Sequence, residues 1–123
     1  IEEARYWKQR LGGAMRQAGI IAAGGIYALE NNIDRLEEDH EKARFLAGEL
    51  SNLPGIEINP VEVETNIVIF EVWEMTAEEL SEKLLKEGVR LSVVGNNRLR
   101  AVTHLDVDRS DIEYVVEVFG RVL

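Results

Sequence analysis

The chain has no cysteine and only two prolines among its 123 residues. Without cysteine it can form neither a disulfide framework nor a thiolate metal site, which is typical of proteins in a reducing compartment. Its longest uncharged run, residues 17–29, is too short to cross a bilayer and is diluted by glycine. We therefore expect one ordinary hydrophobic core and no membrane partner.

Positive charge is also scarce. The 14 lysines and arginines are outnumbered by 23 aspartates and glutamates, which gives a net charge of −9. A polyanion would be repelled by this average field, and no local cluster of basic residues offsets it. We therefore do not expect the chain to bind nucleic acid.

The chain lacks a complete catalytic set. A lysine that forms a Schiff base needs a desolvated pocket that lowers its pKa. All four lysines are instead predicted on polar helix faces: Lys8, Lys42, Lys83 and Lys86. The two histidines, His40 and His104, are far apart in the sequence and form no metal-binding pattern, so we expect structural roles for both. The Gly19–Gly25 region lacks the lysine ending of a phosphate-binding loop.

The first half of the sequence is predicted to be helical. A short polar helix over Glu2–Arg10 is interrupted by Gly12 and Gly13, and a helix of small residues follows over residues 14–29. Apolar residues then recur at three- and four-residue steps, which predicts that a helical seam continues up to Pro54, with Asn31 and Asn32 as the candidate position for a kink. The seam residues are Leu29, Ile33, Leu36, His40, Ala43, Ala47 and Leu50. The opposite, solvated face comprises Glu37, Glu38, Asp39, Glu41 and Lys42.

The second half alternates between strand and helix patterns. Strands are predicted over residues 56–58, 65–72, 89–94 and 99–104, the last two joined as a hairpin. A capping box at Thr76–Glu79 opens a helix whose buried stripe would be Leu80, Leu84 and Leu85. Asp108 is predicted to cap a final helix that buries Ile112, Val115, Val116 and Phe119. The expected fold is α+β, a short, mostly antiparallel sheet covered by helices.

Two sequence segments suit the binding of anions. Arg16 follows the glycine pair, and Arg100 lies in a strand-like run between apolar neighbours. Arg98 would point to the same face as Arg100, so either arginine could bind an anion while the other is an edge charge. From the residues alone, Arg16 is more often a surface charge than a functional group.

Several segments, taken together, resemble the low-specificity threonine aldolases. They follow the order of that family and cover nearly the whole chain. They are residues 7–23, with Leu-Gly-Gly-Ala-Met-Arg-Gln-Ala-Gly at 11–19, and residues 28–32, 35–40, 63–68 and 100–107.

The resemblance implies the carboxy-terminal portion of an aminotransferase-like, fold type I enzyme that uses pyridoxal 5'-phosphate. Residues 1–28 would end the large domain and residues 29–123 would form the small α+β domain. Such a cytoplasmic lyase of threonine catabolism cleaves L-threonine or L-allo-threonine to glycine and acetaldehyde. It would assemble as a homo-oligomer, a dimer or a homotetramer, with shared active sites. The chain starts at Ile1 within a helical pattern, so we expect a piece of a longer protein.

The resemblance also implies roles for individual residues. Arg100 would bind the substrate α-carboxylate, and Arg16 would reach the cofactor phosphate of a neighbouring subunit, because a guanidinium matches such oxygens bidentately. Many members have a lysine seven residues before the motif arginine. Gln9 occupies that position here, and its neighbour Lys8 is the candidate substitute. The Schiff-base lysine would lie upstream, so this chain alone is expected to be inactive.

Two other functions stay open. The same fold could perform another reaction, as a related lyase, racemase or transaminase, or the chain could be a non-enzymatic α+β interaction domain. The exposure of Ile20, Ile21 and Ile26 separates the last alternative. An independent domain would bury them, whereas an enzyme fragment would leave this helix surface uncovered.

Overall fold

The computed structural model describes all residues from 1 to 123 and divides into two compact units, Ile1–Arg35 and Leu36–Leu123. The first unit contains α1 (Glu2–Arg10) and α2 (Ala18–Asn31), neither of which buries a residue. The division after Arg35 lies later than the boundary expected between residues 28 and 29. The assignment of the first part to a large domain stays a prediction.

Helix α2 begins four residues later than the sequence indicates. The predicted start at Ala14 is wrong, because Gln17 adopts a left-handed conformation with φ of 55° and the helix begins at Ala18. A non-glycine residue with positive φ cannot continue a right-handed helix. The chain therefore turns through residues 11–17 before α2 starts.

The single helical seam across residues 29–50 is also wrong. Helix α2 ends at Asn31, and a turn closed by the Arg35 N–H on the Asn32 carbonyl separates it from α3 (Leu36–Leu50). Asn31 uses its side chain to donate to the Tyr27 carbonyl, the local competition with the backbone that weakens helices at asparagine. Only the later part of the seam is buried: Ala43, Ala47 and Leu50.

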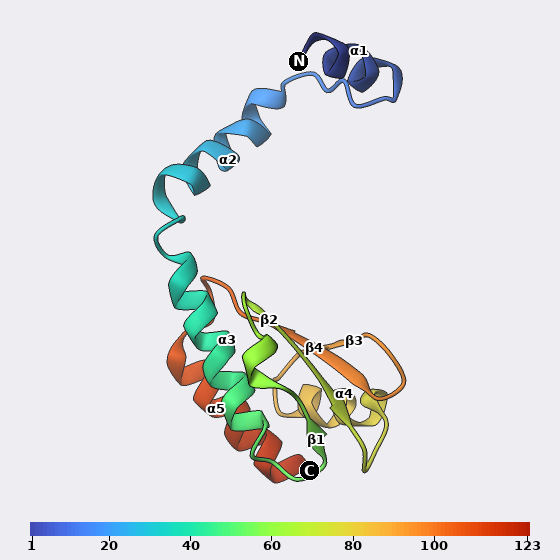
Figure 1. Cartoon of the computed structure of the whole chain (residues 1–123), viewed down its shortest axis with the longest axis vertical. Helices are drawn as coiled ribbons and strands as arrows, with labels where there is room; N and C mark the ends of the chain where they lie inside the picture. Colours follow the sequence, from blue (N-terminus) through green and yellow to red (C-terminus); the bar gives the residue numbers. More distant parts are fainter. The chain divides into compact units, whose positions relative to one another are not determined.

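A four-stranded antiparallel sheet forms the centre of the second unit (Figure 1). Its order is β1-β2-β4-β3, with β1 at Ile56–Glu57, β2 at Ile67–Val72, β3 at Ser92–Val93 and β4 at Arg98–Val102. The predicted hairpin is confirmed as the β3–β4 pair. Pro60, which cannot donate to a strand ladder, starts a short 3-10 helix at Pro60–Glu62.

Three helices cover one face of this sheet and leave the other open: α3, α4 (Ala77–Lys86) and α5 (Arg109–Val122) (Figure 1). Val68, Phe70 and Val72 of β2 point into the core, where the ring of Phe70 packs edge-to-face on Phe119 with centroids 5.6 Å apart. Burial alternates along β2 and β4, as a sheet with one covered face requires. The predicted α+β class is confirmed.

The solvated face expected on α3 is partly wrong. Asp39 is buried, and the Lys42 ammonium lies 2.6 Å from its carboxylate. Lys42 also donates to the carbonyls of His104 and Val107, at 3.0 and 2.6 Å. The loop between β4 and α5 packs over this face of α3. A contact between segments so distant in the sequence cannot be predicted from a local sequence pattern.

Both predicted helix caps are present. Thr76 and Glu79 form a capping box at α4, and Asp108 and Asp111 form one at α5. Of the expected buried face of α5, Ile112 and Phe119 are buried, Val115 and Val116 pack partly against the core, and Val118 is buried as well.

Replacing Asp108 by asparagine is expected to flatten the acid dependence of stability. The Ser110 hydroxyl and the Asp111 N–H hold the pKa of Asp108 below its ordinary value of 3.8. A lowered folded-state pKa stabilises the fold above the unfolded pKa, and this contribution is lost as the pH falls through the folded value. Asparagine caps equally well without titrating. Urea unfolding between about pH 6 and pH 2.5 measures the slope. Parallel curves for both proteins would contradict this role.

Leu84 and Leu85 give a matched test of the core. The predicted burial of Leu85 is wrong, since it is 53% exposed, whereas Leu84 is fully buried. We expect Leu84→Ala to lower the free energy of unfolding by about 2–4 kcal/mol and Leu85→Ala by less than about 1 kcal/mol. Chemical denaturation of the 123-residue chain measures both. Equal losses would show that α4 packs through another face.

Candidate functional site

The open face of the sheet carries the first candidate site. Along β4, Leu99 and Ala101 are buried under the helices, whereas Arg98, Arg100 and Val102 are exposed. This alternation confirms that the two arginines share one face. We define the open sheet face by the half-buried Glu71 and the exposed residues on β2, β4 and the adjoining segments: Ile67, Ile69, Trp73, Ser92, Val94, Arg98, Arg100 and Val102.

Arg100 is the unpaired cation of this surface. Its neighbours across the sheet are Ile69 on β2 and Ser92 on β3. The guanidinium makes no ion pair and no side-chain hydrogen bond, so its donors are available to a ligand. A free guanidinium favours an anionic partner. When that partner also covers the apolar side chains beside the guanidinium, water competes less for the charged groups and their attraction becomes stronger.

Arg98 is occupied, in contrast to Arg100. Its guanidinium forms an ion pair with Glu71, its neighbour on β2, and its Nε donates to Glu71 Oε1 at 3.1 Å. The sequence left open which of the two arginines could bind an anion. In the structure only Arg100 is free.

The second candidate site is the turn between α1 and α2. Gly12 has a φ of +77°, and the Gly13 N–H donates to the Lys8 carbonyl at 2.8 Å, which folds the turn back over the end of α1. A Cβ at Gly13 would lie 3.0 Å from Lys8 Cγ and 3.2 Å from its carbonyl oxygen. Glycine at this position therefore lets the turn lie against Lys8.

This turn completes a cationic recess of about 410 Å³ within the first unit. Its lining is Arg5, Lys8, Gln9, Ala14, Met15 and Arg16. None of these residues is acidic, and none of the three cationic side chains makes an ion pair. A compact, multiply charged anion such as a phosphate group fits this donor set, because guanidinium and ammonium groups bind its oxygens directly.

Arg5 was not among the site residues predicted from the sequence. The sequence nonetheless contains a pattern that indicates Arg5. Arg5 and Lys8 are three residues apart on one helix, and residues at this spacing share a face. The recess also includes both Lys8 and its neighbour Gln9, which holds the position of the family's lysine.

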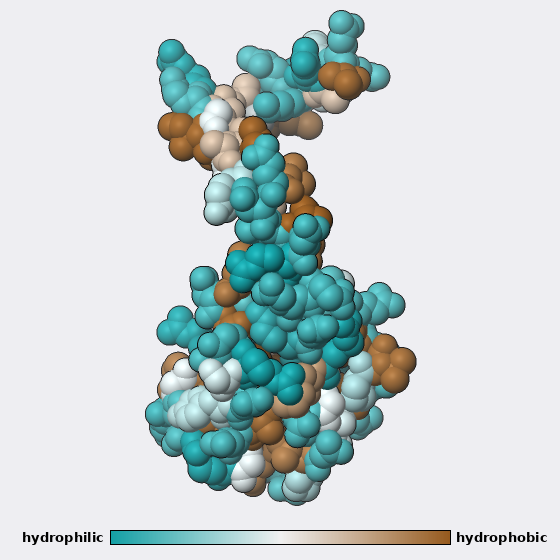
Figure 2. Space-filling view, turned by 90° about the vertical axis from the view of Figure 1, so that its left-hand side faces the viewer, coloured by the Kyte–Doolittle hydropathy of each residue, from teal (hydrophilic) through white to brown (hydrophobic).

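The surface of α2 is apolar and uncovered. Ile20, Ile21 and Ile26 are 79%, 67% and 56% exposed. Figure 2 shows brown, hydrophobic side chains on the surface of this N-terminal unit. The exposure is the outcome expected of an enzyme fragment rather than of an independent interaction domain. Large exposed apolar patches mark protein contacts.

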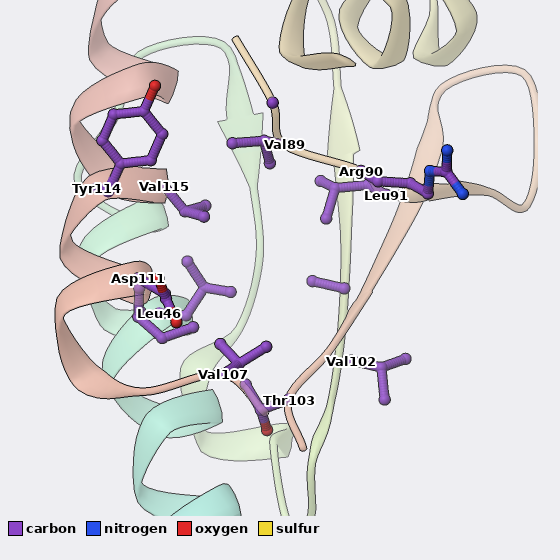
Figure 3. Close-up of a pocket in the computed structure, with 13 residues that line it drawn as sticks. Leu46, Val89, Arg90, Leu91, Val102, Thr103, Val107, Asp111, Tyr114 and Val115 are labelled. Carbon is purple, nitrogen blue, oxygen red and sulfur yellow. The ribbon is translucent and has the colours of Figure 1, made fainter. Parts of the chain in front are cut away.

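A hollow of about 260 Å³ lies on the other, helix-covered side of the sheet (Figure 3). Leu46, Val107 and Val115 point toward it, whereas the Arg90 guanidinium points away. It lies between β4 and residues 89–91, the segment before β3. This segment is not paired with β4, because the β3–β4 pairing ends at Ser92 and Arg100. Arg100 does not line it, although Val102 of the open sheet face is among its lining residues.

The histidines form no catalytic or metal group. His40 Nδ1 lies 3.8 Å from Glu37, whose pKa is lowered by hydrogen bonding to Arg44. His104 Nδ1 accepts from the Asp106 N–H at 3.2 Å within the loop before α5. No group of three or more potential ligands converges as a metal ion requires. None of the helices has the length and apolar run needed to cross a membrane.

Solved structures with the same fold include enzymes, one of which is described with a PLP cofactor. The cystine C-S lyase C-DES, also seen with glycine covalently linked to its PLP cofactor, matches with a TM-score of 0.66 at 19% identity. The match covers 81% of this chain and 27% of that one. A sugar aminotransferase from Micromonospora echinospora matches with a TM-score of 0.65 at 18% identity over 80% of this chain and 34% of that one. The fold is that of fold type I PLP-dependent enzymes.

The family follows from the sequence comparisons. Residues 1–72 match the family described as beta-eliminating lyase, and the chain belongs to that family. The low-specificity L-threonine aldolase 1 of Arabidopsis thaliana is 35% identical over 126 residues, covering 100% of this chain and 35% of that protein. The low specificity L-threonine aldolase of Escherichia coli strain K12 is 39% identical over 115 residues, covering 94% and 33%. The resemblance indicated by the motifs is thereby confirmed. The chain spans about a third of the length of these relatives.

Proposed function

We propose that this chain is the carboxy-terminal part of a PLP-dependent low-specificity threonine aldolase, which cleaves L-threonine or L-allo-threonine to glycine and acetaldehyde. The observation that carries the proposal is the pair of unpartnered cationic sites, Arg100 on the open sheet face and Arg16 in the cationic recess. By the resemblance of the surrounding motifs, they would correspond to the two positions at which threonine aldolases hold substrate and cofactor.

Arg100 would bind the α-carboxylate of the amino acid. Two parallel N–H donors hold a carboxylate in one orientation, which fixes the Cα bond that stands perpendicular to the cofactor ring. The exposed side chains of Ile69 and Val102 lie near Arg100. Covered by the rest of the enzyme, they would exclude water and strengthen the guanidinium–carboxylate pair.

Arg16, with Lys8 and Arg5, would hold the cofactor phosphate. The recess offers three cations and no carboxylate, which fits a phosphate dianion. Bound pyridoxal phosphate supplies the electron sink that accepts the electron pair of the broken Cα–Cβ bond. The chain's own residues contribute position and charge complementarity.

The Schiff-base lysine would come from outside this chain. Lys42 donates to two carbonyls, forms an ion pair with Asp39 and has a side chain only 12% exposed, so its ammonium is already partnered. Lys83 donates to the Val122 carbonyl at 3.1 Å. Neither offers a free amine in a desolvated pocket.

A neighbouring subunit would cover the apolar surface of α2 and share the active site. The exposed isoleucines of α2 support a homo-oligomer, a dimer or a homotetramer. The cytoplasmic location stays a prediction.

The direct test is an assay of the full-length protein with added pyridoxal phosphate. We expect L-threonine to yield glycine and acetaldehyde in equal amounts, the aldehyde being followed by NADH oxidation with alcohol dehydrogenase. Formation of D-threonine or of a keto acid without acetaldehyde would instead assign racemase or transaminase activity.

A further inference from the structure

The ion pair beside Arg100 controls the charge of the open sheet face. Arg98 and Arg100 are two residues apart on β4, so their Cα atoms are separated by roughly 6.6 Å along the strand. Glu71 neutralises Arg98, while Arg100 has no such partner. An exposed ion pair contributes little to stability, about 0–1 kcal/mol, so its larger consequence here is electrostatic.

A polar recess of about 240 Å³ lies next to this pair, lined by Glu71 and residues 94–98. The backbone of its loop is held in place, because the Asn96 and Asn97 carbonyls accept from the N–H groups of Ala77 and Val72 at 2.9 and 2.8 Å. The side-chain amides of both asparagines make no hydrogen bond. The recess therefore combines amide donors and a guanidinium with a single carboxylate.

We infer that Glu71 is a specificity-determining residue that excludes amino acids carrying a second carboxylate. This inference rests on the proposed role of Arg100 as the carboxylate ligand. A substrate held there would bring a side-chain carboxylate toward Arg98, since the two arginines lie two residues apart on one face of β4 and a four-carbon diacid carries its second carboxylate two carbons away from the first. Glu71 occupies Arg98 and repels the incoming anion.

A change of substrate preference is expected when Glu71 loses its charge. In the full-length enzyme, Glu71→Gln should raise the ratio of kcat/KM for L-3-hydroxyaspartate to kcat/KM for L-threonine by about tenfold. The reaction remains an aldol cleavage. The Cα–Cβ bond breaks, the β-hydroxyl proton is lost, and a proton is added at Cα, so that hydroxyaspartate gives glycine and glyoxylate.

Two further variants separate this effect from a general loss of negative charge. Glu57→Gln removes the same charge from the residue opposite Glu71 on β1 but leaves the Arg98 pair intact, so the ratio should stay at the wild-type value. The double variant Glu71→Gln, Arg98→Gln should lose the gain. A gain that persists in the double variant, or appears equally in Glu57→Gln, overturns the inference.

A binding measurement tests the role of Glu71 independently of turnover. Isothermal titration calorimetry of the full-length protein measures the binding. Glu71→Gln should bind succinate about tenfold more tightly than the wild type does, whereas the affinity for propionate, which has a single carboxylate, should change much less. If the wild type cleaves threonine but the substrate ratio does not move, Glu71 does not set specificity. If threonine is not cleaved at all, the proposed function fails, and unchanged succinate affinity would then overturn the inference as well.

Discussion

Replacing Arg100 by alanine in the full-length enzyme is expected to lower kcat/KM for L-threonine by roughly 30- to 1,000-fold, mainly through a higher KM. The change removes a charge-assisted, bidentate contact worth about 2–4 kcal/mol. Arg100→Lys should recover part of the loss, because lysine restores the charge without the planar fork. Steady-state kinetics over a wide threonine range measures both variants.

The matched control is Arg121→Gln at the end of α5. Arg121 pairs with Glu87 and lies on the helical side of the unit, away from the open sheet face. This variant removes the same charge, and we expect wild-type kinetics. Unchanged KM in Arg100→Ala would rule out Arg100 as the carboxylate ligand.

Replacing Arg16 by glutamine is expected to weaken cofactor retention by about 10- to 100-fold, because the recess loses one of its two guanidinium groups, each a bidentate donor for phosphate oxygens. Equilibrium dialysis of pyridoxal phosphate, or its absorbance after gel filtration, measures the loss. Arg10→Gln is the matched control, since Arg10 interacts with Tyr6 and does not line the recess.

Hybrid oligomers test whether this contact crosses a subunit interface. Mixing subunits that carry Arg16→Gln with subunits that carry Arg100→Ala would create some sites with an intact Arg100 from one subunit and an intact Arg16 from its neighbour. In a dimer with shared sites, up to about a quarter of wild-type activity should return at equal mixing. No recovery after verified subunit exchange would place both arginines in the same subunit's site.

Local signals made most of the second unit predictable. The capping boxes at Thr76 and Asp108 each depend on residues three apart, and both are present. The two-residue period of a strand is enough to predict that Arg98 and Arg100 share a face, and the alternating burial along β4 confirms it. Such features depend on a few neighbouring residues, so the sequence contains them directly.

The wrong predictions fall where distant segments or local competition decide the outcome. The burial of Asp39 and the partial burial of Lys42 depend on a loop more than sixty residues away, as the Lys42–His104 and Lys42–Val107 contacts show. The break after Asn31 interrupts an apolar spacing that continues in the sequence. The pairing of Arg98 with Glu71 needs the β2–β4 register, which no single segment reveals.

Arg100 and Arg16 are proposed to hold opposite ends of a cofactor-bound amino acid, and the assigned function depends on this pair. A structure of the full-length holoenzyme with glycine bound tests it most directly. We expect the Arg100 guanidinium within hydrogen-bond distance of the glycine carboxylate, and the guanidinium of Arg16 from a neighbouring subunit on the cofactor phosphate. An Arg100 paired with a protein carboxylate, or an Arg16 remote from any phosphate, would contradict the proposal.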